Sequence, residues 1–502
     1  MAQVEATEAG SLRYASAQGR CVLLATVLGS AVVMLDGTVV NVALPAIGRD
    51  LRAGIDGLQW TVSGYLLTLS ALILLGGALG DRFGRRRVFV IGVIWFAAAS
   101  LVCGLAPNLP ALVAARVLQG IGGALLTPGS LAILQASFAD DDRAQAIGAW
   151  SGLGGIATAI GPFLGGYLVQ AVSWRLIFLL NLPLAAAVVY VAARHVPETS
   201  DIEGAREIDV VGAVLAMVGL GGTTYALIEA PALGASSPAI LLTGVGGVIA
   251  LVAFFFLEAR SSHPMLPLTL FKSRQFTATN LVTLAVYGAL GAVFFLLILQ
   301  LQQVVGYGPV QAGVAMLPIT ALLLVISPRA GKLAARIGPR IPLTLGPLIA
   351  ASGVALLARI GQGSTYLLDI LPPLVLFGVG MSITVAPLTA TVMGSVESRH
   401  AGMASAVNNA VARTAGLVAV AVLPPIAGLS GTAYLNPDVF SAGFSKAMLI
   451  AAGLTALGGI LGWITLKENA PVAHEHTDEY CCALDAPPLR SRPVAGGRYS
   501  QH

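Results

Sequence analysis

The sequence predicts an all-α protein that crosses a membrane many times. Of its 502 residues 56% are apolar and only 10% are charged, and the mean hydropathy is +0.84. A water-soluble chain cannot bury this much hydrocarbon in its cores, so lipid has to be part of its solvent. The apolar residues also form long blocks without the alternating polarity of barrel strands. Helices are expected, because backbone groups in lipid must be satisfied within their own segment.

Charged residues and clusters of glycine and proline divide the chain into fourteen apolar blocks. Most of them reach the roughly 20 residues that a helix needs to cross a bilayer. The first block is too long for the core of a signal peptide, so we expect it to remain as a span. The expected spans lie near 21–47, 57–79, 88–106, 110–134, 145–170, 174–194, 208–229, 238–257, 277–301, 310–328, 341–359, 366–393, 402–429 and 444–466.

The basic residues predict the orientation of these spans. Most of the 28 Lys and Arg residues lie in the two tails or in the loops on the same side as the tails. Because positively charged loops remain in the cytoplasm, both termini are expected there. The net charge of +4 then reflects topology, and we expect no nucleic-acid partner. The exceptions are Arg49, Arg52, Arg175 and Arg359 in the opposite loops, and Arg116, Arg413 and Lys446 inside blocks.

An internal repeat relates the first six spans to the last six. GALGDRFGRRR at 77–87 is matched by GKLAARIGPR at 331–340, and GIGGALLTP ending at Pro128 is matched by GVGMSITVAP ending at Pro387. Two spans between the halves have no counterpart. Secondary transporters are built from such repeats and bind substrate between them near the membrane midplane.

The repeat and the loop charges together predict the organisation of the chain. We expect a cytoplasmic N-tail (1–20), an N-terminal six-helix half (21–194), a linker with two inserted helices (195–257), a cytoplasmic loop (258–276), a C-terminal six-helix half (277–466) and a disordered cytoplasmic tail (467–502).

Several motifs resemble those of a known family. GALGDRFGRRR resembles the loop motif of the major facilitator superfamily, and LDGTVVNVALP at 35–45 is similar to the first-helix motif of its fourteen-span drug:proton antiporters. The resemblance covers about residues 20–466. It implies the major-facilitator fold, with two six-helix halves and two extra central helices. Further similarity lies at Arg116, Gln119 and Gly120 in the fourth block and at Gly306, Tyr307, Gly313 and Pro318.

Glycines in the fifth block resemble the antiporter motif of that family. Gly148, Gly161, Pro162 and Gly165 fall at the motif's intervals, whereas Ala157 stands where the motif prefers glycine. Glycine weakens a helix in water but allows close helix packing in lipid. The resemblance implies in addition a hinge or a seal against proton leak; packing alone is the alternative.

Asp36 is the only acid deep inside an apolar block. A charged aspartate there costs about 2.5 to 3.5 kcal/mol unless it has a partner or a wet cavity, so its default interpretation is functional. We expect Asp36 to load and release a proton in competition with substrate. The alternative is that it only bonds backbone or Thr38. By the resemblance Arg116 faces Asp36 and modulates its proton affinity, but an arginine that bonds neighbouring carbonyls is an equal alternative.

The loop at 77–87 has an acid among its arginines. By the resemblance Asp81, Arg82 and Arg86 form a breakable latch that closes the cytoplasmic side, with Asp81 against a helix N-terminus of the other half. Gly77 and Gly84 would permit the close approach and the tight turn. The alternative is a loop that only sets topology.

Candidate substrate contacts carry the weakest signal. Polar and aromatic residues in or near spans also serve as interfacial anchors, so most of them are expected to be structural. An apolar lining with few charges suits lipophilic, neutral or cationic compounds. The candidates are Trp60, Tyr65, Gln119, Asn181, Asn280, Gln300 and Asn408.

Cofactor and metal sites are not expected. HEHTDEYCC at 474–482 contains possible soft-metal ligands, but its spacing matches no zinc pattern. The apolar blocks hold no cluster of His, Cys or acids, which argues against an enzyme. No GxxxxGK[ST] loop is present, which argues against an ATP-driven pump.

These observations predict a monomeric proton-coupled exporter that alternates access. It would exchange lipophilic or cationic drugs, including antibiotics, for protons, with small-molecule substrate, protons and membrane lipid as its partners. Arginine-rich, lysine-poor composition favours a bacterial chain, hence the cytoplasmic membrane. The alternatives are export of a specific lipid, siderophore or endogenous metabolite and, less favoured, a proton symporter.

Overall fold

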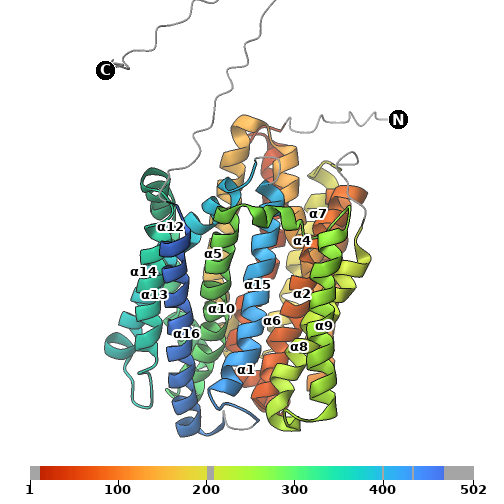
Figure 1. Ribbon diagram of the computed structural model, residues 1–502. Helices are drawn as coiled ribbons and strands as arrows, with labels where there is room; N and C mark the ends of the chain where they lie inside the picture. The colour runs from red at the N-terminus through yellow and green to blue at the C-terminus, as the bar shows by residue number, and fades with distance from the viewer. Residues whose placement is uncertain (1–11, 201–207, 398–400, 432–434, 468–502) are drawn as a thin grey trace, which may run out of the picture. The chain divides into compact units, whose positions relative to one another are not determined.

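The computed structural model describes residues 12–200, 208–397, 401–431 and 435–467. Over these residues the regular secondary structure is helical, apart from one isolated β-bridge between Leu12 and Phe138. The tail motif at 474–482 lies outside the described residues, as does nearly all of the predicted tail. The prediction of an all-α fold is confirmed (Figure 1).

Each of the fourteen expected spans coincides with one helix or with two consecutive helices. Among the described residues, thirteen stretches are long and apolar enough to cross a membrane, and α13 is a shorter apolar helix. The helices are α1 (Ala17–Asp50), α2 (Ile55–Phe83), α3 (Arg85–Gly104), α4 (Leu109–Ser137), α5 (Asp140–Ala171), α6 (Leu176–Leu179), α7 (Asn181–His195), α8 (Val210–Leu233), α9 (Pro238–Arg260), η1 (Leu268–Lys272), α10 (Arg274–Gln303), α11 (Pro309–Ala315), α12 (Leu317–Ile337), α13 (Pro342–Leu357), η2 (Tyr366–Ile370), α14 (Leu371–Gly394), α15 (Ala401–Ile426) and α16 (Pro437–Thr465).

Local sequence explains where many of these helices begin. A side-chain oxygen just before the first turn accepts a hydrogen bond from an amide that has no partner within the helix. Six helices start in this way where the residue before the first turn is described. Their capping residues are Ser16 (α1), Asn108 (α4), Asp209 (α8), Ser237 (α9), Ser273 (α10) and Asn436 (α16).

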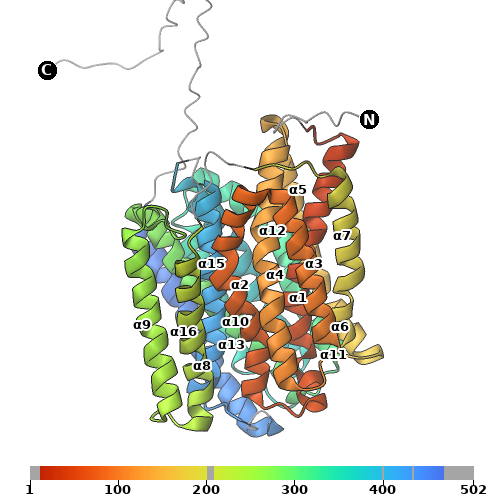
Figure 2. The same cartoon turned by 90° about the vertical axis from the view of Figure 1, so that its right-hand side faces the viewer.

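The helices pack mainly with others from the same repeat. Among the first seven, α4 packs against α2 and α3, and α1 packs against α5 and α7. Among the last, α10 packs against α15 and α16, and α14 against α12 and α13. The two inserted helices, α8 and α9, pack on each other, and α8 also contacts both α2 and α15 (Figure 2). We call the helices α1–α7 the N half and the helices α10–α16 the C half.

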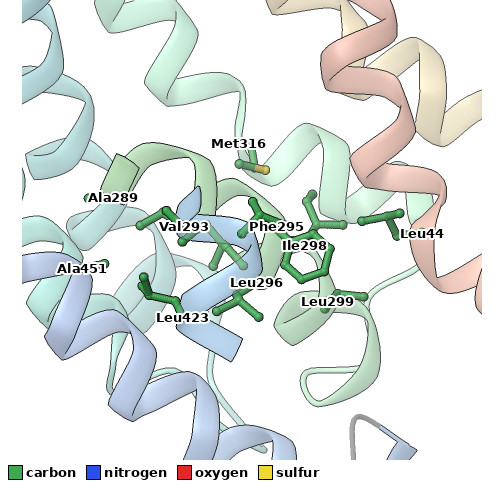
Figure 3. Packing of buried hydrophobic residues seen from close by; sticks show 14 of the residues in the cluster. Leu44, Ala289, Val293, Phe295, Leu296, Ile298, Leu299, Met316, Leu423 and Ala451 are labelled. Atoms are coloured by element: carbon green, nitrogen blue, oxygen red, sulfur yellow. The ribbon is translucent and has the colours of Figure 1, made fainter. Parts of the chain in front are cut away.

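Buried hydrophobic residues connect the two halves at one end of the bundle, the end that carries the α1–α2 connection. We call this the loop-1 end. There Leu44 of α1 and Leu58 of α2 belong to the same buried cluster as Phe295, Ile298 and Leu423 of the C half. Figure 3 shows side chains of α10 between Leu44 on one side and Leu423 on the other. At the opposite end of the N half, a second cluster that includes Phe89, Phe138 and Val196 draws only on N-half residues.

Candidate functional site

The structure brings Asp36 and Arg116 into direct contact in the middle of the N half. Arg116 Nη1 donates to Asp36 Oδ2 at 2.5 Å. Asp36 is 2% exposed and Arg116 is 1% exposed, so neither charge reaches solvent. Thr38, the alternative partner of Asp36, donates instead to the carbonyls of Met34 and Leu35 in its own helix.

Two side-chain amides complete the surroundings of the carboxylate. Gln119 Nε2 donates to Asp36 Oδ1 at 2.8 Å, and Asn181 Nδ2 reaches the same oxygen at 3.3 Å. Both amide nitrogens also lie within hydrogen-bond distance of Ser100 Oγ, at 2.8 and 3.3 Å respectively. Asp36 is therefore held by donors from α4 and α7, and Ser100 connects these donors to α3.

The guanidinium of Arg116 is equally well satisfied. Its Nε donates to the carbonyl of Thr61 on α2 at 3.0 Å, and Nη1 also contacts Gln119 Oε1 at 2.6 Å. The ring of Tyr65 covers it, with 4.3 Å between Cζ and the ring centroid. Burying an ion pair is costly, but removing one partner of a buried pair costs more, roughly 3 to 5 kcal/mol. This network therefore ties α1, α2, α3, α4 and α7 to the charge state of one carboxyl group.

Ser100 and the Thr61 carbonyl are parts of this site that were not predicted from the sequence. A lone serine in an apolar span has no periodic signal, and a backbone carbonyl has no sequence signal at all. Asn181 and Gln119 were predicted as weak substrate contacts, and Gln119 also belongs to the family-like motif of the fourth block. Their amides are engaged with Asp36, and their role toward substrate stays a prediction.

Four other weak substrate candidates have hydrogen-bond partners inside the protein. Trp60 Nε1 donates to Glu229 of α8 at 2.7 Å. Asn408 Nδ2 donates to Asn280 Oδ1 at 3.1 Å and to Thr283 at 2.8 Å, and the Nε2 of Gln300 donates to the Ile360 carbonyl at 2.7 Å. These contacts join helices to one another, which accords with the structural alternative.

The 77–87 loop contacts its own half in this structure. Asp81 pairs with Arg85 at 2.8 Å, and Gly84 makes the turn with φ of 105°. Arg86 donates to the Val196 carbonyl, and its backbone amide donates to Glu198 Oε1 at 3.0 Å. Gly77 lies against Pro128 of α4, and Arg82 lies over the ring of Phe83. Glu198 was not recognised in the sequence; the cross-half latch stays a prediction for another conformation.

The glycines of α5 divide into two groups. A Cβ on Gly161 would collide with Thr38 of α1, and one on Gly165 with Val39 of α1, so α5 and α1 approach closely. On its other contact, α5 approaches the C half: a Cβ on Gly313 of α11 would collide with the backbone carbonyl of Pro162. Gly148 has open space where a Cβ would be. The motif glycines near the loop-1 end are thus packing residues, whereas Gly148 is not.

Hydrogen bonds between the halves also lie at the loop-1 end. Gln302 Nε2 donates to the Val42 carbonyl at 2.9 Å, and the amide of Val310 donates to Gln170 Oε1 at 3.4 Å. The Ile55 amide donates to the Gly431 carbonyl at 2.9 Å. These contacts connect α1, α2 and α5 to segments of the C half.

A further bond at this end follows from two consecutive prolines in α15. Pro424 and Pro425 have no amide hydrogen, so the carbonyls four residues earlier, of Val420 and Ala421, lose their helical donors. Gln59 Nε2 of α2, 1% exposed, donates to them at 2.6 and 3.4 Å. A side chain of the N half therefore satisfies backbone groups of the C half.

Comparison with known proteins identifies the family. The model of the Major Facilitator Superfamily matches residues 26–421. The chain belongs to this superfamily. It is 37% identical to the multidrug resistance protein Stp of Mycobacterium tuberculosis over 418 residues. The aligned region covers 83% of this chain and 77% of that protein. It is 35% identical to the methylenomycin A resistance protein of Bacillus subtilis, over 92% of this chain and 97% of that protein.

Solved structures agree on the fold of this superfamily member. A mutant of the peptide transporter POT superimposes with a TM-score of 0.64 at 13% identity, over 91% of this chain and 96% of that one. A bacterial homologue of the human lysosomal transporter Spinster, in an inward-facing and unoccupied conformation, gives 0.60 at 17% identity, over 90% and 97%. The protein is a multi-pass membrane transporter of small molecules and not an enzyme.

Proposed function

We propose that this transporter exports lipophilic small molecules, antibiotics among them, in exchange for protons that bind Asp36. The names of its relatives support the substrate class: besides the two above, they include a tetracenomycin C resistance and export protein and a puromycin resistance protein, both from Streptomyces species. The buried Asp36–Arg116 pair is the observation that supports proton coupling.

Protonation of Asp36 would change the packing of the N half. The neutral acid no longer compensates Arg116, and the oxygen that accepts from Gln119 and Asn181 becomes a poorer acceptor. Helices α4 and α7 then lose part of what holds them to α1. One proton is thereby converted into a rearrangement within the bundle, as an alternating-access cycle requires.

The contacts at the loop-1 end support a rocking motion between the halves. The loop charges support an orientation with this end outside the cytoplasm and both termini inside. The bonds of Gln59 and Gln302 would then close the external side, and the conformation would be inward-facing, with Asp36 ionised after releasing its proton. Opening outward breaks these bonds and allows the 77–87 loop to meet the C half. The two bodies that move in this proposal are the predicted six-helix halves, 21–194 and 277–466.

Efflux from inverted membrane vesicles tests the proposal. A pH gradient imposed with the vesicle interior acidic should drive uptake of at least one member of a panel of fluorescent cationic, neutral and acidic compounds. Asp36→Asn should abolish this gradient-driven uptake while the variant still exchanges the same compound between equal pH compartments. Gradient-driven transport by Asp36→Asn at the wild-type rate rules out Asp36 as the proton site.

A further inference from the structure

Arg413 is a second deep arginine, and its charge is not balanced as that of Arg116 is. It lies in the middle of α15 and is half-buried. None of the ion pairs found among the described residues includes it, and its Nε is buried without a hydrogen-bond partner. Since Asp36 and Arg116 cancel, Arg413 leaves one positive charge in the middle of the bundle that no ion pair among the described residues balances.

The surroundings of Arg413 place it where the two halves meet. Helix α15 packs against α2 of the N half and α10 of the C half. Tyr65 lies in α2 and Tyr287 in α10, two of the helices against which α15 packs. The Tyr65 hydroxyl is itself buried without a partner. Asn409, one helical turn before Arg413 on the same face of α15, is exposed.

A lone arginine at this depth needs a counterion. An unpaired charge at the centre of a membrane span is costly, and intramembrane charges normally pair with another group or line a wet pathway. A guanidinium offers a planar fork of donors that matches a carboxylate, sulfonate or phosphate. A cationic compound at the same place would be repelled.

We propose that Arg413 binds the acidic group of the transported compound, so that lipophilic anions are the favoured substrate class. Asn409, exposed one helical turn before it, supplies an uncharged polar contact beside it. As regards transport, this inference rests on the proposed export function. It replaces the expectation of cationic substrates, which was based on an apolar lining and did not take the charge balance into account.

Three pyrene probes of similar shape test the proposal: 1-pyrenebutyrate, the neutral 1-pyrenebutanol and the cationic pyrenylbutyl-trimethylammonium. Binding to the purified full-length protein in lipid nanodiscs is measured by energy transfer from tryptophan to pyrene, without any pH gradient. Wild type should bind the carboxylate more tightly than the alcohol, and the cation least. Arg413→Gln should raise the Kd of the carboxylate about tenfold or more and leave that of the alcohol unchanged.

Arg413→Lys is the matched control, because it keeps the charge and loses the fork. It should retain a preference for the carboxylate that is weaker than in wild type. A thermal melt checks that each variant is folded. If Arg413→Gln does not fold, the proposal is tested by the binding preferences of wild type and Arg413→Lys for the three probes.

The proposal is overturned if wild type binds the cation or the alcohol at least as tightly as the carboxylate. It is also overturned if the folded Arg413→Gln weakens carboxylate and alcohol equally, or neither. Failure of the proposed function is separate. A carboxylate preference without gradient-driven efflux contradicts proton coupling alone, whereas gradient-driven efflux without a charge preference contradicts this inference alone.

Discussion

The two halves share a fold but differ in how they treat charge. In the N half, Asp36 and Arg116 form a buried pair surrounded by amide donors. In the C half, Leu374 stands near the position that corresponds to Arg116 in the repeat, and Arg413 has no acid partner among the described residues. The polar contact between α10 and α15 is made by the uncharged Asn280 and Asn408.

This difference suggests a division of work between the halves. A balanced pair can respond to a proton, because protonation unbalances it. An unbalanced arginine can respond to an anion, because binding balances it. The repeat supplies two similar scaffolds, and under the two proposals each half would bind a different ligand.

The largest expected effect is a difference in the free energy of unfolding between variants of the two arginines. Arg116→Gln leaves Asp36 as an uncompensated buried charge, and we expect it to lower the free energy of unfolding by roughly 3 to 5 kcal/mol. Arg413→Gln removes a charge that has no partner, so the same measurement should show no loss. Thermal unfolding in detergent, followed by tryptophan fluorescence, compares the two variants. Equal destabilisation by both would contradict the distinction between the halves.

A double variant sharpens the interpretation of the N half. Asp36→Asn combined with Arg116→Gln removes both charges, so it should be more stable than Arg116→Gln alone, with a coupling energy of about 0.5 to 3 kcal/mol. The four proteins of this cycle are compared by the same melts. Additive effects would show that the pair is not a unit.

The next largest effect is expected from a substitution at Gln59, in the contact between the two halves. Gln59→Leu leaves the carbonyls of Val420 and Ala421 without a donor, which costs about 1 to 3 kcal/mol if they stay buried. Opening the external side hydrates them, so the variant should favour the outward-open state. Ser430 lines a pocket of about 140 Å³ beside Gln59. A cysteine at position 430 should react faster with a thiol reagent in Gln59→Leu than in the protein with Gln59 intact. An unchanged rate would show that Gln59 does not help to close the external side.

The smallest effect distinguishes two glycines of one motif. Gly161→Ala forces a Cβ against Thr38 and should cost about 1 to 3 kcal/mol, whereas Gly148→Ala meets open space and should be neutral or slightly stabilising. Melts of both variants in lipid test this. A motif that acted as a uniform packing face would make the two substitutions equally harmful.

Much of the fold followed from the sequence, because lipid imposes strict requirements on length and hydrophobicity. All fourteen blocks became helices, and the charged residues inside them identified Asp36 and Arg116 before any geometry was known. The polar groups that surround the pair could not be predicted. Ser100 and Asn181 are neutral residues whose value depends on which helices pack together.

The link through Gln59 shows the same limit. Two consecutive prolines in an apolar helix indicate that two carbonyls need a new donor. The sequence contains no information on which of its many amides will supply it, because that depends on the contact of α2 with α15 across 361 residues of chain. Glu198, which contacts the turn at Gly84, was missed for the same reason.

Proton movement during transport tests the central role of Asp36 most directly. In inverted vesicles energised with an acidic interior, a pH-sensitive dye reports the gradient while an exported compound is added. Wild type should dissipate part of the gradient on addition, because each cycle returns a proton through Asp36. Asp36→Asn, present in equal amount, should leave the gradient unchanged. Equal dissipation by Asp36→Asn and wild type would contradict the account.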